Sequence, residues 1–138
     1  VYGKASEELI TESHPKKPIN PYGLSKLITE DILFKYRDQF EFNPLVFRYF
    51  NAVGADPEGD TGEWHDPEPH ILPTLIHKAL RNEKVFINGN QFQTRDGTCE
   101  RDYVHVMDLA EAHVLGLKSL LAKKNKESII YSFHRGSK

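Results

Sequence analysis

Apolar residues recur every three or four positions from Leu24 to Ile32, the spacing at which side chains share one face of an α-helix. Asn20 and Pro21 stand just ahead of this pattern. Asparagine is favoured as the N-cap of a helix, and proline is favoured at its first position. The pattern therefore predicts a helix that begins at Pro21 and continues to about Tyr36.

The rest of the chain alternates between strand-like and helix-like stretches. Short runs rich in β-branched and aromatic residues predict strands, and apolar residues at helical spacing predict helices. The predicted strands are 45–51, 84–89, 101–106 and 128–133, and the predicted helices are 70–82 and a last one capped by Asp108 and ending near Leu121. Strands that alternate with helices predict an α/β fold.

Two stretches lack such periodicity and are predicted to be loops. Residues 1–19 are rich in charge and proline, which indicates a surface loop. Residues 52–69 are dense in glycine, proline and aspartate. The second loop is longer than most connections, and that length is typical of a binding loop.

Composition narrows the classes of function. Eighteen Lys and Arg are balanced by twenty Asp and Glu without a basic stripe, which argues against a nucleic-acid partner. No apolar run approaches the ~20 residues of a membrane span, and no signal peptide is visible. The single cysteine, Cys99, cannot form an internal disulfide and fits a reducing compartment, so we expect a cytoplasmic location.

The predicted helix start places Tyr22 four residues before Lys26, so the two side chains would share a face. A lysine ammonium and the positive end of a helix both favour a negatively charged phenolate, which can act as a base. The YxxxK spacing is weakly specific by itself. An exposed tyrosine beside a solvated lysine is the more frequent explanation of such a pair.

Two further positions suit a ligand with phosphate groups. Tyr49, Phe50 and Asn51 end the 45–51 strand, and open α/β sheets bind ligands beyond the carboxyl ends of their strands. An asparagine here could bind phosphate or hydroxyl groups, or it could simply turn the chain. Arg101 opens a strand after a polar loop, where it could bind a phosphate or form a surface ion pair with an acidic neighbour.

A group of possible metal ligands lies within the stretch EWHDPEPH. Its members are Glu63, His65, Asp66, Glu68 and His70. The two prolines of this stretch prevent a helix that would place the ligands on one face, and the spacing matches no zinc motif. The sequence therefore predicts no metal.

Longer strings in the chain are much more specific. VYGK, YGLSK, FRYFNAVGADPEGDTGE, HILP, FING and TRDGTCERDYVHVMDLAEAH occur in the same order and near spacing as in the UDP-glucose 4-epimerases, which residues 1 to about 121 resemble. Those enzymes are extended short-chain dehydrogenases/reductases that interconvert UDP-glucose and UDP-galactose with bound NAD. The resemblance implies the C-terminal part of a Rossmann-like parallel sheet plus a smaller mixed α/β substrate domain.

The resemblance also implies roles for individual residues. Tyr22 resembles the catalytic base that takes the proton of the sugar 4-hydroxyl, and Lys26 resembles the residue that holds the nicotinamide ribose, so both also contact the cofactor. Tyr49 and Phe50 match cofactor contacts, and Asn51 matches a contact to the substrate diphosphate. The remaining implied substrate contacts are His70 and Ile71 in a loop, Phe86, Ile87 and Asn88 in a strand around the uracil, and Arg101 at the diphosphate.

The chain departs from the family pattern in three places. It contains no GxxGxxG loop, no catalytic Ser or Thr precedes VYG, and the residues after IYSF diverge. We therefore expect a fragment, from a truncated or frameshifted reading frame, with a cofactor-domain remnant at 1–53 and a partial substrate domain at 54–138. By itself the chain is expected to lack epimerase activity and to bind NAD weakly, since the GxxGxxG loop would hold the NAD pyrophosphate.

Other functions remain open at this stage. The parent could be a 4-epimerase for another UDP-sugar or a related dehydratase. The chain could also be a degenerate, non-catalytic remnant that still binds a nucleotide sugar. We expect the parent enzyme to be a homodimer, as its family resemblance implies.

Overall fold

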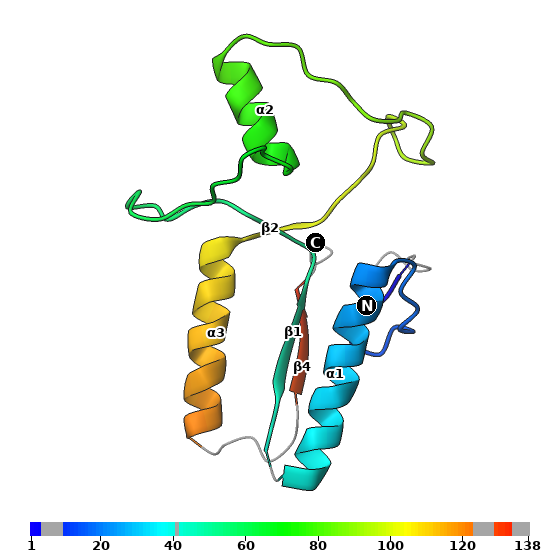
Figure 1. The fold of residues 1–138 in the computed structure, drawn as a ribbon, viewed down its shortest axis with the longest axis vertical. Coiled ribbons are helices and arrows are strands. Elements are labelled where there is room, and N and C mark those ends of the chain that lie inside the picture. Colours follow the sequence, from blue (N-terminus) through cyan, green and yellow to red (C-terminus); the bar gives the residue numbers. More distant parts are fainter. Residues whose placement is uncertain (4–9, 41, 123–128, 134–138) are drawn as a thin grey trace.

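The computed structural model describes residues 1–3, 10–40, 42–122 and 129–133 (Figure 1). The elements follow in the order α1 (Pro21–Phe40), β1 (Leu45–Tyr49), β2 (Asn51–Val53), α2 (Ile71–Leu80), β3 (Tyr103–His105), α3 (Val106–Leu121) and β4 (Ile129–Phe133). Helices accompany parallel strands, which confirms the predicted α/β class. Residue 128, the first of the last predicted strand, lies outside the described residues.

Helix α1 begins as the sequence predicts. The side-chain oxygen of Asn20 accepts a hydrogen bond from the backbone N–H of Gly23 at 2.7 Å, and Pro21 is the first helical residue. This bond satisfies one of the free N–H groups at the start of the helix. The helix continues past the predicted end at Tyr36 to Phe40.

Strands β1 and β4 pair in parallel, and helices cover both faces of this sheet. Successive side chains of a strand point to opposite faces. The ring of Phe47 lies 4.7 Å from the ring of His113 on α3, whereas Arg48 bonds to Glu30 on α1. Helices α3 and α1 therefore pack against opposite faces of β1, and they flank it in Figure 1.

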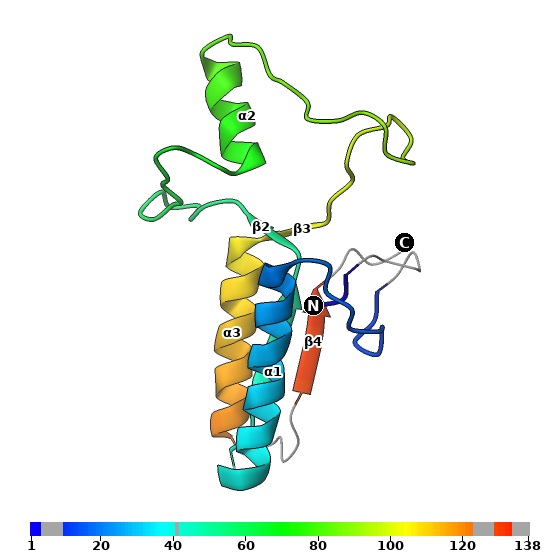
Figure 2. The same ribbon diagram turned by 45° about the vertical axis from the view of Figure 1, so that its right-hand side comes forward.

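The predicted strand 45–51 is divided at Phe50. After this residue the chain enters β2, which pairs in parallel with β3 and not with β4, with Asn51 opposite Tyr103. The chain thus changes its pairing partner at the carboxyl end of β1. Figure 2 shows the paired strands β2 and β3 above the upper ends of α1 and α3.

A buried ion pair joins α1 to β1. Arg48 is 7% exposed and Glu30 is 5% exposed, and the guanidinium donates to both carboxylate oxygens at 2.8 and 2.6 Å. Arg48 also donates to the hydroxyl of Tyr2 at 2.8 Å, and this hydroxyl lies 2.6 Å from the hydroxyl of Ser132 on β4. The hydrogen bond to Glu30 raises the pKa of the Arg48 guanidinium, against the opposing effect of burial. The predicted surface loop 1–19 thus contributes a buried side chain, Tyr2.

The predicted strand at 84–89 is wrong. These residues form no strand, and Val85, Phe86 and Ile87 are all exposed. A strand requires a hydrogen-bonding neighbour, and no segment of the described residues pairs with this one. Strand-like composition was therefore not sufficient to predict a strand in this segment.

The predicted cap of the last helix is also wrong. Helix α3 starts at Val106, and its N-cap is His105, whose Nδ1 accepts from the backbone N–H of Met107 at 3.2 Å. Asp108 lies instead in the first turn, where its negative charge complements the helix dipole. Strand β3 is correspondingly shorter than the predicted 101–106.

The two predicted domains share a sheet. Strand β4 belongs to the range 54–138, and it pairs with β1 of the range 1–53. The division at residue 53 stays a prediction. Among the described residues, none of the helices is long and apolar enough to cross a membrane.

Candidate functional site

An open pocket of about 650 Å³ lies where the chain leaves β1 and enters β2. Three parts of the chain line it: residues between Phe50 and Asp56, the loop residues 61–63 with His70, and the start of α3 at Val106, Met107 and Ala110. The carboxyl ends of parallel strands and the beginning of a helix thus surround one cavity. This is the usual position of a ligand site in an open α/β sheet.

Three of the predicted site residues line this pocket: Phe50, Asn51 and His70. The side-chain amide of Asn51 donates to the backbone oxygen of Asp102 at 2.9 Å, and its backbone N–H donates to the same oxygen at 3.2 Å. Asn51 therefore holds β2 against the segment that leads into β3. The sequence left open whether Asn51 binds a ligand or only shapes the backbone. Its bonds to Asp102 show a structural role, and they hold Asn51 in the wall of the pocket.

Tyr22 and Lys26 lie on the first turns of α1, and both side chains are exposed. The ammonium of Lys26 is 5.2 Å from the centre of the Tyr22 ring, so the two residues share a face as their spacing predicts. Both views place the start of α1 at the same end of the sheet as the carboxyl end of β1. Neither residue is among those that line the pocket.

Several predicted contact residues lie outside the pocket lining. They are Tyr49, Ile71, Phe86, Ile87, Asn88 and Arg101, and all six are exposed. Phe86 packs instead beneath the ammonium of Lys78 on α2, 5.6 Å from the ring centre. The predicted roles of these six residues in binding remain predictions.

The sequence interpretation missed the contribution of α3 to the pocket. Val106 was treated only as part of a strand, Ala110 only as part of a helix, and Met107 was assigned to neither. All three form one wall of the pocket. The strand-to-helix junction was visible in the sequence. Only the pairing of β3 with β2 brings that junction beside Asn51.

Gly54 lines the pocket and lies next to His105, and its substitution has a predictable cost. Its φ is +98°, a conformation that favours glycine, and a Cβ there would overlap the His105 imidazole. We expect Gly54→Ala to lower the free energy of unfolding by about 1–3 kcal/mol, measured by urea denaturation.

The matched control is Gly62→Ala, in the same pocket wall. A Cβ at Gly62 meets no atom within 4 Å. This variant should therefore unfold within about 0.5 kcal/mol of the unmodified chain. Equal effects of the two substitutions would contradict the role assigned to Gly54.

Comparison with known proteins places this arrangement in a family. Residues 1–131 match the NAD dependent epimerase/dehydratase family. The chain belongs to that family. Among the described residues, the match covers every helix and strand except the last two residues of β4.

Similar proteins within the family are UDP-glucose 4-epimerases. The chain is 44% identical to the one from Rhizobium leguminosarum bv. trifolii over 137 residues, which are 99% of this chain and 41% of the relative. It is 45% identical to the one from Rhizobium meliloti, with the same coverage. The chain thus spans about two fifths of the length of the curated relatives it matches.

Solved structures agree with these sequence matches. The UDP-glucose 4-epimerase from Brucella ovis in complex with NAD superposes with a TM-score of 0.87 at 42% identity, over 99% of this chain and 42% of that one. The enzyme from Bifidobacterium longum in complex with NAD+ and UDP gives 0.80 at 36% identity, over 97% and 40%. The Rossmann-like character predicted for the sheet is therefore confirmed.

Proposed function

We propose that this chain carries the base and part of the nucleotide-sugar pocket of a UDP-glucose 4-epimerase, which interconverts UDP-glucose and UDP-galactose. The observation that carries the proposal is the pocket at Asn51 and His70. It lies at the end of the sheet where Tyr22 and Lys26 are exposed. A base close to a pocket for the nucleotide sugar is what such an enzyme requires.

In this proposal Tyr22 removes the proton of the sugar 4-hydroxyl, and it returns a proton when the 4-hydroxyl forms again. Lys26 is one helical turn away, and its positive charge stabilises the phenolate. The N-terminal end of α1 adds to that effect, since its partial charge is positive. Asn51 and Arg101 bind the diphosphate, and His70 with Ile71 borders the sugar.

The residues present also fit one half of an NAD molecule. Tyr49 and Phe50 expose aromatic surface at the carboxyl end of β1, and Lys26 offers an ammonium for the ribose hydroxyls. When bound, NAD would supply the acceptor for the hydride at C4. The GxxGxxG pattern that binds a pyrophosphate does not occur in these 138 residues, so we propose weak binding of NAD by this chain.

We also propose a cytoplasmic, dimeric parent enzyme. Leu24, Ile28 and Ile32 recur along one side of α1, and each is about half exposed. An apolar row of this kind suits packing against a second helix. Sedimentation of the parent enzyme at a dimer mass would support the proposal, and a monomer would contradict it.

Binding of UDP to the chain tests the proposed function directly. A ligand at about 100 times its dissociation constant should stabilise the fold by about 2.7 kcal/mol. We therefore expect UDP and UDP-glucose to raise the melting temperature, whereas glucose alone should not. A folded chain whose melting temperature is unchanged by both nucleotides would contradict the proposal.

Substitution of Arg101 locates the bound nucleotide. We expect Arg101→Ala to weaken UDP binding by about 1.5–3 kcal/mol, because a hydrogen bond to the charged diphosphate is lost. Arg95→Ala is the matched control, since Arg95 is an exposed arginine in the loop that precedes Arg101 and has no proposed contact with the ligand. Equal losses in both variants would indicate only a general charge effect.

A further inference from the structure

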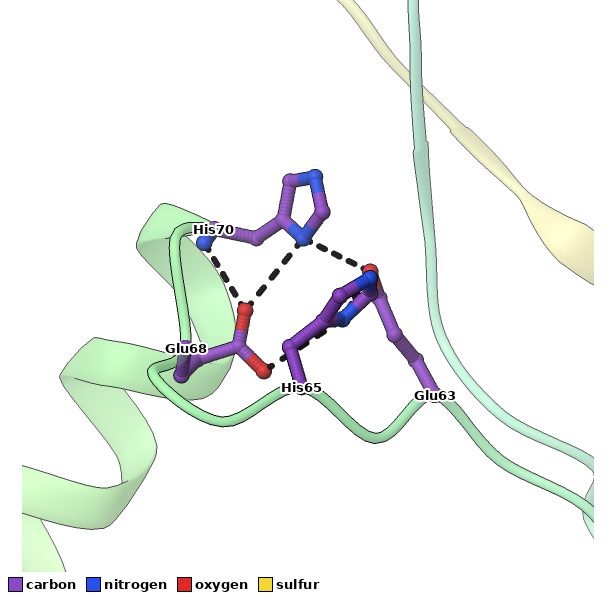
Figure 3. A group of neighbouring side chains, drawn as sticks. All are labelled: Glu63, His65, Glu68 and His70. Atoms are coloured by element: carbon purple, nitrogen blue, oxygen red, sulfur yellow. Dashed lines mark hydrogen bonds and ion pairs between the residues drawn. The ribbon is translucent and has the colours of Figure 1, made fainter.

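Four side chains of the loop before α2 converge on one point (Figure 3). They are Glu63, His65, Glu68 and His70, called here the 63–70 cluster, and their possible ligand atoms all lie within 4.8 Å of one another. His70 Nδ1 lies 2.6 Å from an oxygen of Glu63 and 3.2 Å from one of Glu68. His65 Nδ1 lies 3.2 and 3.9 Å from oxygens of the same two carboxylates.

We propose that the 63–70 cluster is a binding site for a divalent transition metal ion of the zinc class. Two imidazole nitrogens and two carboxylate oxygens form a mixed donor set that Zn²⁺ accepts in tetrahedral geometry. With metal–ligand distances of about 2.0–2.2 Å, neighbouring donor atoms of a tetrahedron are about 3.3–3.6 Å apart. The four nitrogen–oxygen distances lie on both sides of that range, so small side-chain rotations complete the shell.

The charges of the cluster favour a cation. Glu63 and Glu68 face each other across the two imidazoles, and the Glu68 side chain is only 14% exposed. Within the described part of the chain, no lysine or arginine forms an ion pair with either carboxylate. A divalent ion would balance both carboxylates at once, while the neutral imidazoles supply the other two ligands.

The structure also removes one of the two reasons for predicting no metal, while the spacing still matches no zinc motif. The two prolines do exclude a helix, but the four side chains gather from an irregular loop, which does not need helical spacing. Asp66, the fifth candidate in the sequence, is not a member of the cluster. A metal bound here would tie the loop to the first turn of α2, since His70 is the N-cap of that helix.

The test measures Zn²⁺ alone, without nucleotide, so its outcome is independent of the proposed function. The full chain should carry no affinity tag and should contain Cys99→Ser, because Cys99 is exposed and a cysteine thiolate can itself bind Zn²⁺. Competition with a chromophoric chelator should show one Zn²⁺ per chain. Co²⁺ in its place should give the intense visible absorption of a tetrahedral site, and Mg²⁺ should not compete.

Variants of residues outside the pocket lining locate the site. Loss of a group that only orients a metal ligand costs about 10- to 100-fold in metal affinity, and loss of a ligand itself should cost at least as much. His65→Asn and Glu68→Gln should therefore each weaken Zn²⁺ binding by at least about tenfold. His77→Asn, an exposed histidine on α2, should leave it unchanged. Circular dichroism verifies that each variant is folded.

Two results would overturn the inference. The first is a Cys99→Ser chain that binds no Zn²⁺ at micromolar concentration, and the second is binding that His65→Asn and Glu68→Gln leave intact in that background. In either case the 63–70 cluster is a network of hydrogen bonds between imidazoles and carboxylates. A loss of binding confined to the two cluster variants supports the metal site.

Discussion

Arg48→Met should lower the free energy of unfolding by about 3–5 kcal/mol, the largest effect on stability that we expect from a single substitution in this chain. The methionine fills much of the space of the arginine, but it leaves the Glu30 carboxylate buried without its bidentate partner. It also removes a donor to the Tyr2 hydroxyl. Urea denaturation followed by circular dichroism measures the change.

We expect Arg48→Met to lose stability because the buried Glu30 carboxylate is left without a positive partner. A second substitution can separate this effect of charge from an effect of altered packing. In the double variant Arg48→Met/Glu30→Leu no charge remains buried, so most of the lost stability should return. Arg37→Met on α1, the helix that carries Glu30, is the control, because the ion pair of Arg37 with Asp38 is well exposed. It should cost no more than about 1 kcal/mol.

A contrary outcome is simple to recognise. If Arg48→Met and Arg37→Met destabilise the chain equally, the buried pair contributes nothing special. If the double variant is less stable than Arg48→Met alone, the shape of the pair matters more than its charge. Either result would contradict the account of how α1 is held on β1.

The elements with strong local signals were predictable. Asn20 and Pro21 mark the start of α1 because the cap and the fixed φ of proline are local properties, and both were found. The YxxxK pair shares a face because helical geometry requires it. Membership of the family was also foreseen, from strings such as RYFN and RDYVHV that carry more information than spacing.

The features that depend on distant contacts were not predictable. The stretch 84–89 has strand-like composition, yet a strand exists only where a neighbour pairs with it. His105 replaced Asp108 as the cap of α3, because pairing of β3 with β2 fixed where the strand ends. The hydrogen-bond partners of Arg48 lie 18, 36 and 46 positions away in sequence, so no local pattern predicts them.

The candidate site shows the same division. Phe50, Asn51 and His70 were expected at the site, and all three line the pocket. The wall formed by the start of α3 and the convergence of the 63–70 cluster required the folded loop. Candidate site residues can therefore be predicted from the sequence, but the cavity that they line depends on how the strands pair.

Tyr22→Phe should abolish most of the epimerase activity that the proposed function assigns to the parent enzyme. General acid–base catalysis by a positioned side chain contributes about 10²- to 10⁴-fold, so kcat should fall by that factor. This corresponds to about 2.7–5.5 kcal/mol in the activation barrier. The change removes one exposed hydroxyl, so neither folding nor UDP binding should be altered.

Because the chain spans only about two fifths of its relatives, the measurement needs a complete enzyme around it. A chimaera can supply one: this chain replaces the matching segment of the Brucella ovis epimerase, of which it covers 42% at a TM-score of 0.87. The unsubstituted chimaera should interconvert UDP-glucose and UDP-galactose. A chimaera that binds NAD but is inactive on both sugars would contradict the proposed substrate.

Tyr36→Phe is the matched control for the tyrosine, since Tyr36 is an exposed phenol on the same helix that packs against Phe40. It should retain the kcat of the unsubstituted chimaera, while Tyr22→Phe loses it at unchanged affinity for UDP. A kcat of Tyr22→Phe within about threefold of Tyr36→Phe would remove Tyr22 as the base, because positioned proton transfer typically contributes about 10²- to 10⁴-fold. A parallel loss of kcat and UDP affinity would indicate instead that Tyr22 organises the pocket, and the base would have to be sought elsewhere.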